Sequence, residues 1–389
     1  MRILVVSHTY IVPLNCEKLQ ELSRLAPNIE VIVVVPQKWR PGGIQNQVIE
    51  PKKRQQGNFQ VIPIANFSQN NQGLLTFNWE IIKLLKTFKP HIIQVEQGAK
   101  SLAYAQLITL NKLLGIKAKN TFFTWWNLPY TNKFPINFLE KYNLDNTHGL
   151  VSGNQDGADI LREHGYKGKV QVMPQLGVDE ELFSSRSQPE LAAKFKLQPE
   201  DFIIGFVGRF VPEKGILTLI AALTKLTALP WKLLLLGRGE LKAEIEQRAI
   251  TAKIQDRLIM IESVPHDTVA NYINLMNVLV LPSETTYQFK TLTAAGWKEQ
   301  FGHVLIEAMA CEIPVIGSDS GEIPHVINDA GLIFPEGNSS ELSNSLRQLI
   351  ENPELANKLA KKGRDRVMKF YTNKALARAQ LKFYQELIN

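Results

Sequence analysis

The sequence is poor in cysteine and has no long apolar run. Its 389 residues include two cysteines, Cys16 and Cys311, which lie far apart and form no CxxC pair. This spacing argues against a disulfide framework and a structural zinc site, and it favours a reducing compartment. No apolar stretch approaches the roughly 20 residues that span a bilayer, and the run at 3–6 is too short for the core of a signal peptide. We therefore expect a cytoplasmic protein, with any membrane contact peripheral and at the inner face of the plasma membrane.

Three common motifs of nucleotide and metal chemistry are also missing. The apolar run at 3–6 is followed by 7–13 without a G-x-G-x-x-G, which counts against a nicotinamide or flavin site there. There is no G-x-x-x-x-G-K-[ST] loop, and this excludes a P-loop nucleotide hydrolase. No D-x-D pair of carboxylates stands in a suitable loop. We therefore expect no metal and no other cofactor.

The charge is unevenly distributed along the chain. Residues 1–130 carry 15 Lys and Arg against 6 Asp and Glu, a net charge of +9, whereas the rest carry 29 against 31, a net charge of −2. A basic first third suggests an anionic partner such as a membrane surface or a phosphorylated acceptor, although a soluble domain with a lysine-rich surface explains it equally well. Nucleic acid is not expected, because the sequence has no Cys/His finger and no aromatic RNA-binding signature.

Short apolar strands alternate with amphipathic helices along the whole chain, which predicts parallel sheets covered on both faces. The first series has strands at 3–6, 31–35, 91–95, 121–125 and 149–151, with helices at 79–88, 102–114 and 156–164. The polar stretch at 184–189 is the expected linker. The second series has strands at 202–207, 232–236, 258–261, 278–281 and 315–316, with helices at 218–226, 241–251, 266–276, 303–311 and 340–351. Two such series predict two Rossmann-like doubly wound α/β domains facing across a cleft.

The loop after the strand at 202–207 reads GRFVPEKG at 208–215. The guanidinium of Arg209 offers a planar fork and the ammonium of Lys214 a point charge, and both suit phosphate oxygens. The amides of the helix that follows would add to the affinity for an anion. A diphosphate clamp and a surface turn with two solvated cations fit this spacing equally well.

A second motif places Glu299 and Glu307 on either side of a Phe-Gly pair, with a helix starting at His303. The helix N-terminus could face a phosphate while the two carboxylates accept hydrogen bonds from hydroxyls, as a nucleotide sugar requires. The alternative is an amphipathic helix whose N-terminal carboxylate is favoured by the helix dipole. The strand-end segments at 237–240 and 281–283 are weaker signals of the same kind.

In this order and at this spacing, the motifs resemble the family-4 retaining glycosyltransferases of the GT-B fold, in particular members that act in bacterial polysaccharide biosynthesis. The resemblance rests on GRFVPEKG at 208–215, LPS at 281–283, EQFGHVLIE at 299–307 and EAMACEIPVIGSDSGEIP at 307–324, and more loosely on MPQLGVDEELF at 173–183. Glu312 departs from the glycine that is usual there. The segment 284–298 is longer than in many members and could form a flap near the donor, although the sequence does not assign it a role.

The resemblance implies retaining transfer of a hexose from a nucleotide sugar, with UDP-glucose favoured over GDP-mannose, to a glycan or lipid-linked sugar acceptor. Arg209, Lys214 and Glu299 would be catalytic: the two cations stabilise the departing diphosphate and Glu299 contacts the donor sugar. The remaining donor-binding positions would be Gly208, Gly237, Val264, Ser283, Gln300, Phe301, Gly302, His303, Val304 and Glu307.

The family's last helix crosses back to the first domain, which implies an acceptor-binding domain of 1–183 plus 373–389 and a donor-binding domain of 184–372. On the acceptor side, the residues that follow predicted strands are His8, Asn15, Glu96, Trp126 and Asn127. Structural roles for Glu96 and His8 remain open. Two other functions also remain open, a GT-B sugar-nucleotide epimerase and a catalytically inactive sugar-nucleotide-binding module.

Overall fold

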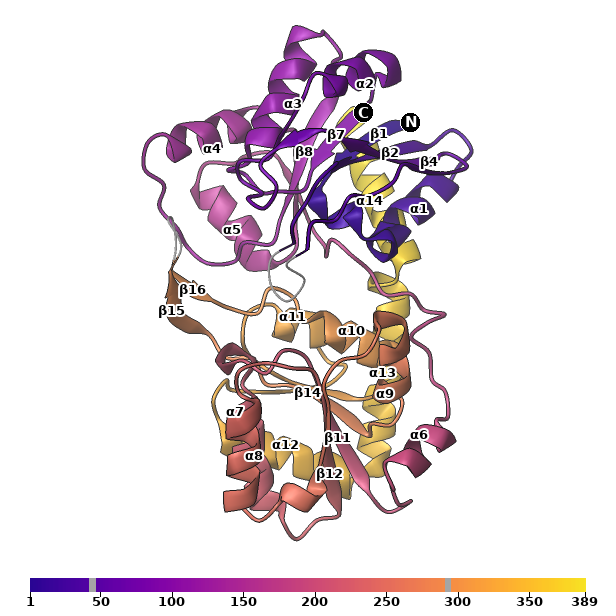
Figure 1. The fold of residues 1–389 in the computed structure, drawn as a ribbon, viewed down its shortest axis with the longest axis vertical. Coiled ribbons are helices and arrows are strands. Elements are labelled where there is room, and N and C mark those ends of the chain that lie inside the picture. The colour runs from indigo at the N-terminus through magenta and orange to yellow at the C-terminus, as the bar shows by residue number, and fades with distance from the viewer. Residues whose placement is uncertain (42–46, 291–294) are drawn as a thin grey trace. The chain divides into compact units, whose positions relative to one another are not determined.

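The computed structural model describes residues 1–41, 47–290 and 295–389 (Figure 1). The chain forms two compact units, Met1–Gly177 with Asn373–Asn389 and Val178–Thr372. It passes to the second unit somewhat before residue 183, because Val178 forms a parallel bridge with Thr372 and the ring of Phe183 packs on that of His266. Among the described residues, no helix is both long and apolar enough to cross a bilayer.

The first unit is built on an eight-stranded sheet in the order β10-β9-β8-β7-β1-β2-β4-β3, parallel except for the β3 edge. Its strands are β1 Arg2–Val6, β2 Glu30–Pro36, β3 Arg54–Gln56, β4 Phe59–Ile64, β7 Ile92–Val95, β8 Lys119–Thr124, β9 Gly149–Ser152 and β10 Lys169–Val172. The short pair β5 Asn66–Phe67 and β6 Thr76–Phe77 lies outside this sheet. The helices are α1 Glu17–Arg24, α2 Glu80–Phe88, α3 Leu102–Leu113, α4 Ile136–Asp145 and α5 Gln155–Glu163, with the 3-10 turns His8–Ile11 and Pro13–Cys16.

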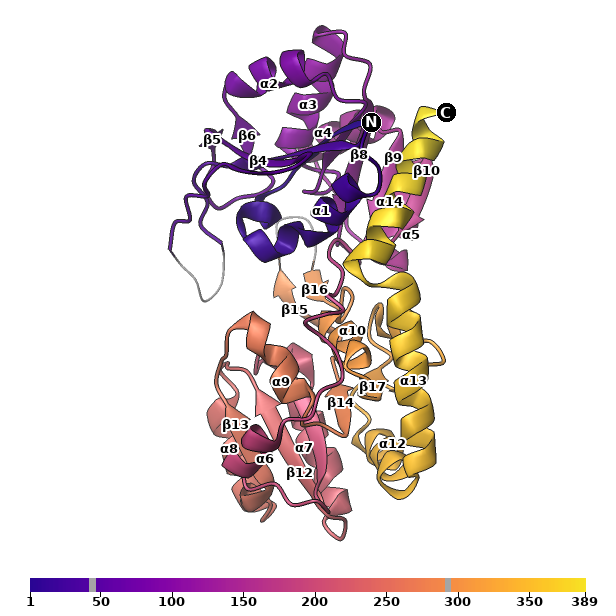
Figure 2. The same ribbon diagram turned by 90° about the vertical axis from the view of Figure 1, so that its right-hand side faces the viewer.

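The last helix, α14 Asn373–Ile388, belongs to the first unit (Figure 2). It packs on α1, and its Leu387 and Phe383 side chains lie over β9 at Gly149. A Cβ at Gly149 would lie 2.6 Å from Leu387 Cδ1, so the missing side chain is what lets this helix approach the sheet. The crossing of the C-terminal helix onto the first unit follows from this packing.

The second unit has a six-stranded parallel sheet in the order β13-β12-β11-β14-β17-β18. Its strands are β11 Phe202–Val207, β12 Trp231–Leu236, β13 Leu258–Ile261, β14 Val278–Leu281, β17 Val315–Ser318 and β18 Leu332–Phe334, and a separate hairpin joins β15 Thr286–Lys290 to β16 Ala295–Trp297. The helices are α6 Pro189–Lys194, α7 Ile216–Leu223, α8 Lys242–Thr251, α9 Val269–Ile273, α10 His303–Ala310, α11 Ile323–Ile327, α12 Ser339–Glu351 and α13 Pro353–Phe370.

In both sheets, consecutive strands are added first toward one edge and then toward the other, so the order of the strands reverses once. In the first unit the chain builds outward from β1 through β2 to β4, and then from β7 through β8 and β9 to β10. In the second unit it builds from β11 to β13 on one side and from β14 to β18 on the other. This is the doubly wound topology predicted from the alternating pattern, and it creates a switch point at β1/β7 and another at β11/β14. Ligands of such sheets bind at the carboxyl ends of the strands at a switch point.

Candidate functional site

The second unit's switch point gathers most of the predicted donor residues. The loop with Gly208, Arg209 and Lys214 follows β11, and Ser283 follows β14, the neighbouring strand. Gly237 follows β12, and Val264 lies in the loop after β13. Because the strands are parallel, all four loops leave the same edge of the sheet.

Two glycines let these loops pack backbone against backbone. Gly215 has φ +62°, and a Cβ there would lie 1.7 Å from the carbonyl oxygen of Pro282. Gly237 has φ +155°, and its Cβ would lie 1.8 Å from the carbonyl oxygen of Gly208. The loop after β11 is thus in backbone contact with the loops after β14 and β12, and a side chain at either glycine would push them apart.

Two predicted residues from separate segments converge on the carboxylate of a third, Glu299. Lys214 Nζ donates to Glu299 Oε2 over 2.5 Å, and Ser283 Oγ donates to the same oxygen over 2.8 Å. Ser283 is itself fixed, because Ser318 Oγ on β17 donates to its carbonyl oxygen over 2.5 Å. The exposed fractions of the Lys214 and Glu299 side chains are 16% and 9%. A pair this desolvated contributes more to fixed geometry than to stability.

Sequence analysis did not find the aromatic ring beside this pair. The Nζ of Lys214 lies 4.9 Å from the centroid of the Trp297 ring. Trp297 ends β16 and pairs with Thr286 on β15. Both strands of the hairpin lie within the segment 284–298, for which the sequence left a flap open, and residues 291–294 lie outside the described residues. The sequence held one signal of this contact: a tryptophan two positions before Glu299, in the segment 284–298 that is longer than in many family members.

Replacing Trp297 with leucine is expected to raise the KM for the predicted nucleotide-sugar donor about 2- to 30-fold, since a partly desolvated cation–π contact is worth roughly 0.5–2 kcal/mol. The measurement is steady-state kinetics with the donor varied. Tyr287→Leu is the matched control, because Tyr287 lies on the same hairpin with a 70% exposed side chain. Equal kinetics for the two variants would contradict a positioning role for Trp297.

Arg209 lies on the same loop as Lys214 but is more accessible. Its Nη2 is 3.4 Å from Oε1 of Glu213, and the exposed fractions of the two side chains are 57% and 5%. Glu213 ties this end of the loop to the segment after β14, because its carbonyl oxygen accepts the Glu284 amide over 2.9 Å. Most of the guanidinium fork is therefore open to a ligand at the carboxyl edge of the sheet.

The Phe-Gly pair forms the entry to α10 as expected. Gly302 is the N-cap residue with φ +83°, and the Phe301 ring is buried against Tyr371 at a centroid distance of 5.6 Å. Burial lowers the pKa of His303, the first residue of the helix, so its imidazole is neutral at pH 7. First-turn amides of a helix have no acceptor within the helix and are suited to an anion.

Glu307 lies one turn into α10 and is buried. Its Oε1 is 3.3 Å from Nε2 of His266, which follows the loop that contains Val264. This contact joins α10 to the strand end of β13 and was not foreseen from the sequence. Gln300 and Val304, the remaining predicted donor positions, are half-buried on either side of the helix start.

Taken together, the carboxyl edge presents an ammonium, an accessible guanidinium and a helix N-terminus, with buried carboxylates at Glu299 and Glu307. Cations and first-turn amides suit a diphosphate. Carboxylates suit the hydroxyls of a sugar or a ribose, since an ionised carboxylate only accepts hydrogen bonds. The arrangement thus has the chemistry that a nucleotide sugar requires.

In the first unit, His8 and Asn15 line the same cavity. His8 begins the 3-10 turn after β1, and its ring packs on that of Trp39 at a centroid distance of 4.8 Å. Asn15 Nδ2 donates to the carbonyl oxygen of Thr9 over 2.9 Å. Burial lowers the pKa of His8 to about 4.

Because the pKa of His8 is lowered in the folded state, the free energy of unfolding is expected to depend on pH. A histidine whose folded pKa lies near 4, against about 6.5 when unfolded, costs stability as the pH falls between these values, by about 2 kcal/mol at pH 5. Urea midpoints at pH 7.5 and pH 5 should therefore differ less for His8→Gln than for the wild type, since both share all other titrating groups. An identical pH dependence of the urea midpoint in the wild type and in His8→Gln would show that folding does not lower the pKa of His8.

Glu96 is buried within a hydrogen-bonded network. Its Oε1 accepts from Gln94 Nε2 over 2.6 Å and its Oε2 from Gln175 Nε2 over 2.7 Å. Gln94 Oε1 in turn accepts from Tyr384 of α14 over 2.6 Å. Both carboxylate oxygens are therefore bonded by amides, and the network connects β7 to the C-terminal helix, which indicates a structural role for Glu96.

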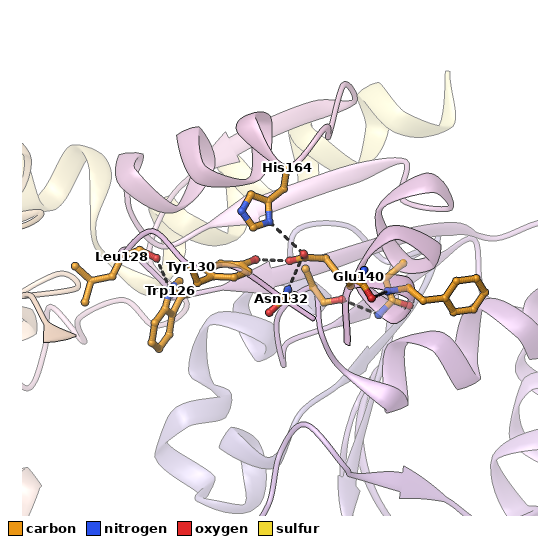
Figure 3. Close-up of polar contacts among 10 residues, drawn as sticks. Trp126, Leu128, Tyr130, Asn132, Glu140 and His164 are labelled. Atoms are coloured by element: carbon orange, nitrogen blue, oxygen red, sulfur yellow. Dashed lines mark hydrogen bonds and ion pairs between the residues drawn. The ribbon is translucent and has the colours of Figure 1, made fainter. Parts of the chain in front are cut away.

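Trp126 belongs to a different cluster, around Glu140 (Figure 3). Its Nε1 donates to the Leu128 carbonyl, and its ring packs edge-on against Tyr130. The Lys100 ammonium lies 3.7 Å from the Tyr130 centroid and 5.4 Å from the Trp126 centroid.

The carboxylate of Glu140 lies at the centre of the hydrogen bonds in this cluster. Glu140 accepts from the Tyr130 hydroxyl and from Asn132 Nδ2, and its Oε2 is 3.1 Å from His164 Nδ1. Asn127, the residue after Trp126 in the sequence, is buried. Neither Trp126 nor Asn127 lines the cavity at His8.

The doubly wound units define the class of fold, and comparison with solved structures identifies it as GT-B. Over 100% of this chain and 99% of the other, the structure is similar to sucrose-phosphate synthase from Thermosynechococcus elongatus, with a TM-score of 0.70 and 20% identity. Over 99% of both chains it is similar to Anabaena Alr3699/HepE in complex with UDP, with a TM-score of 0.71 and 13% identity.

The comparison of sequences concerns mainly the second unit. Residues 187–366 match the family described as glycosyl transferases group 1. Relatives include N-acetyl-alpha-D-glucosaminyl L-malate synthase of Bacillus anthracis, 27% identical over 63% of this chain and 58% of the relative. The capsular polysaccharide biosynthesis glycosyltransferase CapM of Staphylococcus aureus is 31% identical over 44% and 43%. The chain spans about half the length of the curated relatives it matches.

Proposed function

We propose that this protein is a retaining, metal-independent glycosyltransferase that moves a hexose from a nucleotide sugar to a glycan or lipid-linked sugar acceptor in polysaccharide biosynthesis. The observation that carries the proposal is the convergence of Lys214, Ser283 and Glu299 at the switch point of the second sheet, directly before α10. The similarity to CapM supports the polysaccharide assignment.

In the proposed reaction the diphosphate lies between the cations of the loop after β11 and the first turn of α10. The bond between the anomeric carbon and the diphosphate oxygen breaks, and its electron pair stays on that oxygen. Arg209, Lys214 and the helix amides stabilise the charge that develops there. The acceptor oxygen bonds to the anomeric carbon from the same face, and its proton passes to the leaving diphosphate. Glu299 orients the sugar hydroxyls and Glu307 the ribose.

UDP-glucose is the favoured donor and GDP-mannose the second choice. Alr3699/HepE, which has the same fold, has been solved in complex with UDP-glucose, and this supports a uridine donor. On the acceptor side, the net charge of +9 in residues 1–130 supports a lipid-linked acceptor at an anionic membrane surface. No cofactor enters the proposed reaction.

The test is nucleotide release from a panel of UDP- and GDP-sugars, with and without a glycan acceptor and with and without EDTA. The proposal expects acceptor-dependent release from one donor, unchanged by EDTA, and a product with the anomeric configuration of the donor. Binding of a donor without turnover would instead indicate a binding module. Conversion of the donor to another nucleotide sugar without an acceptor would indicate an epimerase, and loss of turnover in EDTA would contradict the metal-independent mechanism.

A further inference from the structure

The first unit contains a cavity of about 470 Å³ at the carboxyl ends of β1 and β2. Small-molecule sites have volumes of roughly 300–1,000 Å³. The cavity is therefore large enough for a small ligand or for the end of a larger one. Its lining residues come from the turns after β1, from the segment after β2 and from the loop between β5 and β6, and they are His8, Thr9, Ile11, Val12, Asn15, Trp39, Pro41, Asn70, Asn71 and Gln72.

The lining is uncharged although the surrounding sequence is basic. Among these ten described residues, His8 alone has a side chain that ionises near neutral pH. Burial lowers its pKa to about 4, so the imidazole is neutral at pH 7. A carboxylate or phosphate that enters the cavity would lose its hydration without gaining a cationic partner from these residues, and such desolvation is costly. The lining therefore disfavours an anionic group.

Among the described residues, the fold bonds two of the lining side-chain amides through one end each. Asn15 uses Nδ2 to donate to the Thr9 carbonyl over 2.9 Å, and its Oδ1 remains as an acceptor. Asn71 uses Oδ1 to accept the backbone amides of Gly73 and Leu74 over 3.0 and 3.3 Å, and its Nδ2 remains as a donor. An oriented acceptor and an oriented donor on one cavity match hydroxyl groups, which both donate and accept.

The rest of the wall is aromatic and aliphatic. The rings of His8 and Trp39 pack at 4.8 Å with an interplanar angle of 35°, next to Ile11 and Val12. Nδ1 of His8 is buried without a hydrogen-bond partner among the described residues. Such atoms are rare in folded proteins and often mark a functional position. Apolar walls with a few placed polar groups are typical of sites for small organic ligands.

We propose that this cavity binds an uncharged sugar residue, and that the group that the enzyme glycosylates is therefore a neutral sugar at the end of its acceptor. The inference rests on the proposed transferase function and names its acceptor class. It also separates two features of the first unit: the cavity selects the neutral sugar, whereas any anionic portion of the acceptor contacts the basic surface elsewhere.

Saturation-transfer NMR of the full chain with methyl glucoside and with methyl glucuronide tests the proposal, because these probes differ mainly by a carboxylate. The neutral glycoside is expected to bind at least about tenfold more tightly. Val12→Trp, which fills the cavity, should abolish this binding. Leu14→Trp adds the same ring at an exposed residue outside the lining and should leave binding unchanged, so it controls for misfolding. Equal or tighter binding of the glucuronide, no binding of the glucoside, or equal effects of the two tryptophans would each overturn the proposal.

Donor turnover by the wild type, measured in the same preparation, separates this inference from the proposed function. Turnover of UDP-glucose without selective binding of the neutral glycoside overturns the acceptor assignment alone. Selective binding that Val12→Trp abolishes, in a protein that turns over no nucleotide sugar, supports the cavity as a sugar site and overturns the transferase function.

Discussion

Replacing Lys214 with methionine is expected to lower kcat by about 10²- to 10³-fold, the usual effect of removing one preorganised group that stabilises charge in the transition state. The ammonium is held at one position by Glu299 Oε2 at 2.5 Å and by the Trp297 ring at 4.9 Å. Methionine keeps most of the length and the apolar contacts of lysine but removes the charge. Steady-state kinetics with saturating donor and acceptor measures the effect.

Lys225→Met is the matched control, because the Lys225 ammonium donates to the hydroxyls of Ser339 and Ser340 on α12. It should retain the wild-type kcat. The double variant Lys214→Met with Glu299→Gln decides between two roles for the lysine. Glu299→Gln alone is the reference, because Glu299 itself is proposed to contact the donor sugar. If Lys214 only neutralises a buried carboxylate, the double variant should be as active as Glu299→Gln, and this would contradict the proposed role in catalysis. The proposed role expects the double variant to be clearly less active than Glu299→Gln.

Replacing Gly215 with alanine is expected to destabilise the second unit by about 3 kcal/mol, since a left-handed backbone conformation and an overpacked contact each cost about 1–3 kcal/mol. Gly215 has φ +62°, and the new Cβ would lie 1.7 Å from the Pro282 carbonyl oxygen. To relieve this contact the loop after β11 must move away from the loop after β14. We therefore expect loss of donor turnover together with the loss of stability.

Gly337→Ala is the control that measures the cost of a left-handed backbone conformation without a steric contact. Gly337 has φ +73° in the same unit, and a Cβ there meets nothing within 4 Å. Its cost should be about 1 kcal/mol. Urea unfolding of both variants, followed by the fluorescence of the buried Trp231, gives the comparison. Similar losses for the two variants would show that the close approach of the two loops is not required.

The buried strands were predictable because a strand covered on both faces has a continuous apolar run. The expected ranges 202–207 and 278–281 coincide with β11 Phe202–Val207 and β14 Val278–Leu281. The helix α13 Pro353–Phe370 was missed, and it contains Gly363, a residue that weakens a helix interior by about 1 kcal/mol relative to alanine. In the structure a Cβ at Gly363 would lie 2.8 Å from Met309 Cγ, so this glycine lets α13 pack on α10.

Glu312 shows why one departure from the family pattern is tolerated. The relatives implied by the motifs usually have glycine there, and in the structure Glu312 has φ +59°, a conformation that glycine adopts most easily. Its side chain is exposed. The turn after α10 thus keeps its backbone conformation with a non-glycine residue.

The donor side of the site could be predicted better than the acceptor side. Motif order placed Lys214 and Ser283 after strands and Glu299 just before a helix, and the fold brings these three segments together. The contacts themselves join residues as far apart as Lys214 and Glu299, so no local pattern could reveal them. Glu96 looks like a site residue because it follows β7, but its amide partner Gln175 comes from a segment after β10. Only the folded chain shows that this carboxylate is already bonded.

The most direct test of the account is a calorimetric titration of the full chain with UDP and with uridine, for the wild type, Arg209→Met and Lys214→Met. The central claim is that the loop after β11 and the start of α10 hold a diphosphate. The account predicts that UDP binds the wild type at least about 100-fold more tightly than uridine does and that each substitution removes most of this difference. Equal affinities for UDP and uridine, or variants that bind UDP as the wild type does, would contradict it.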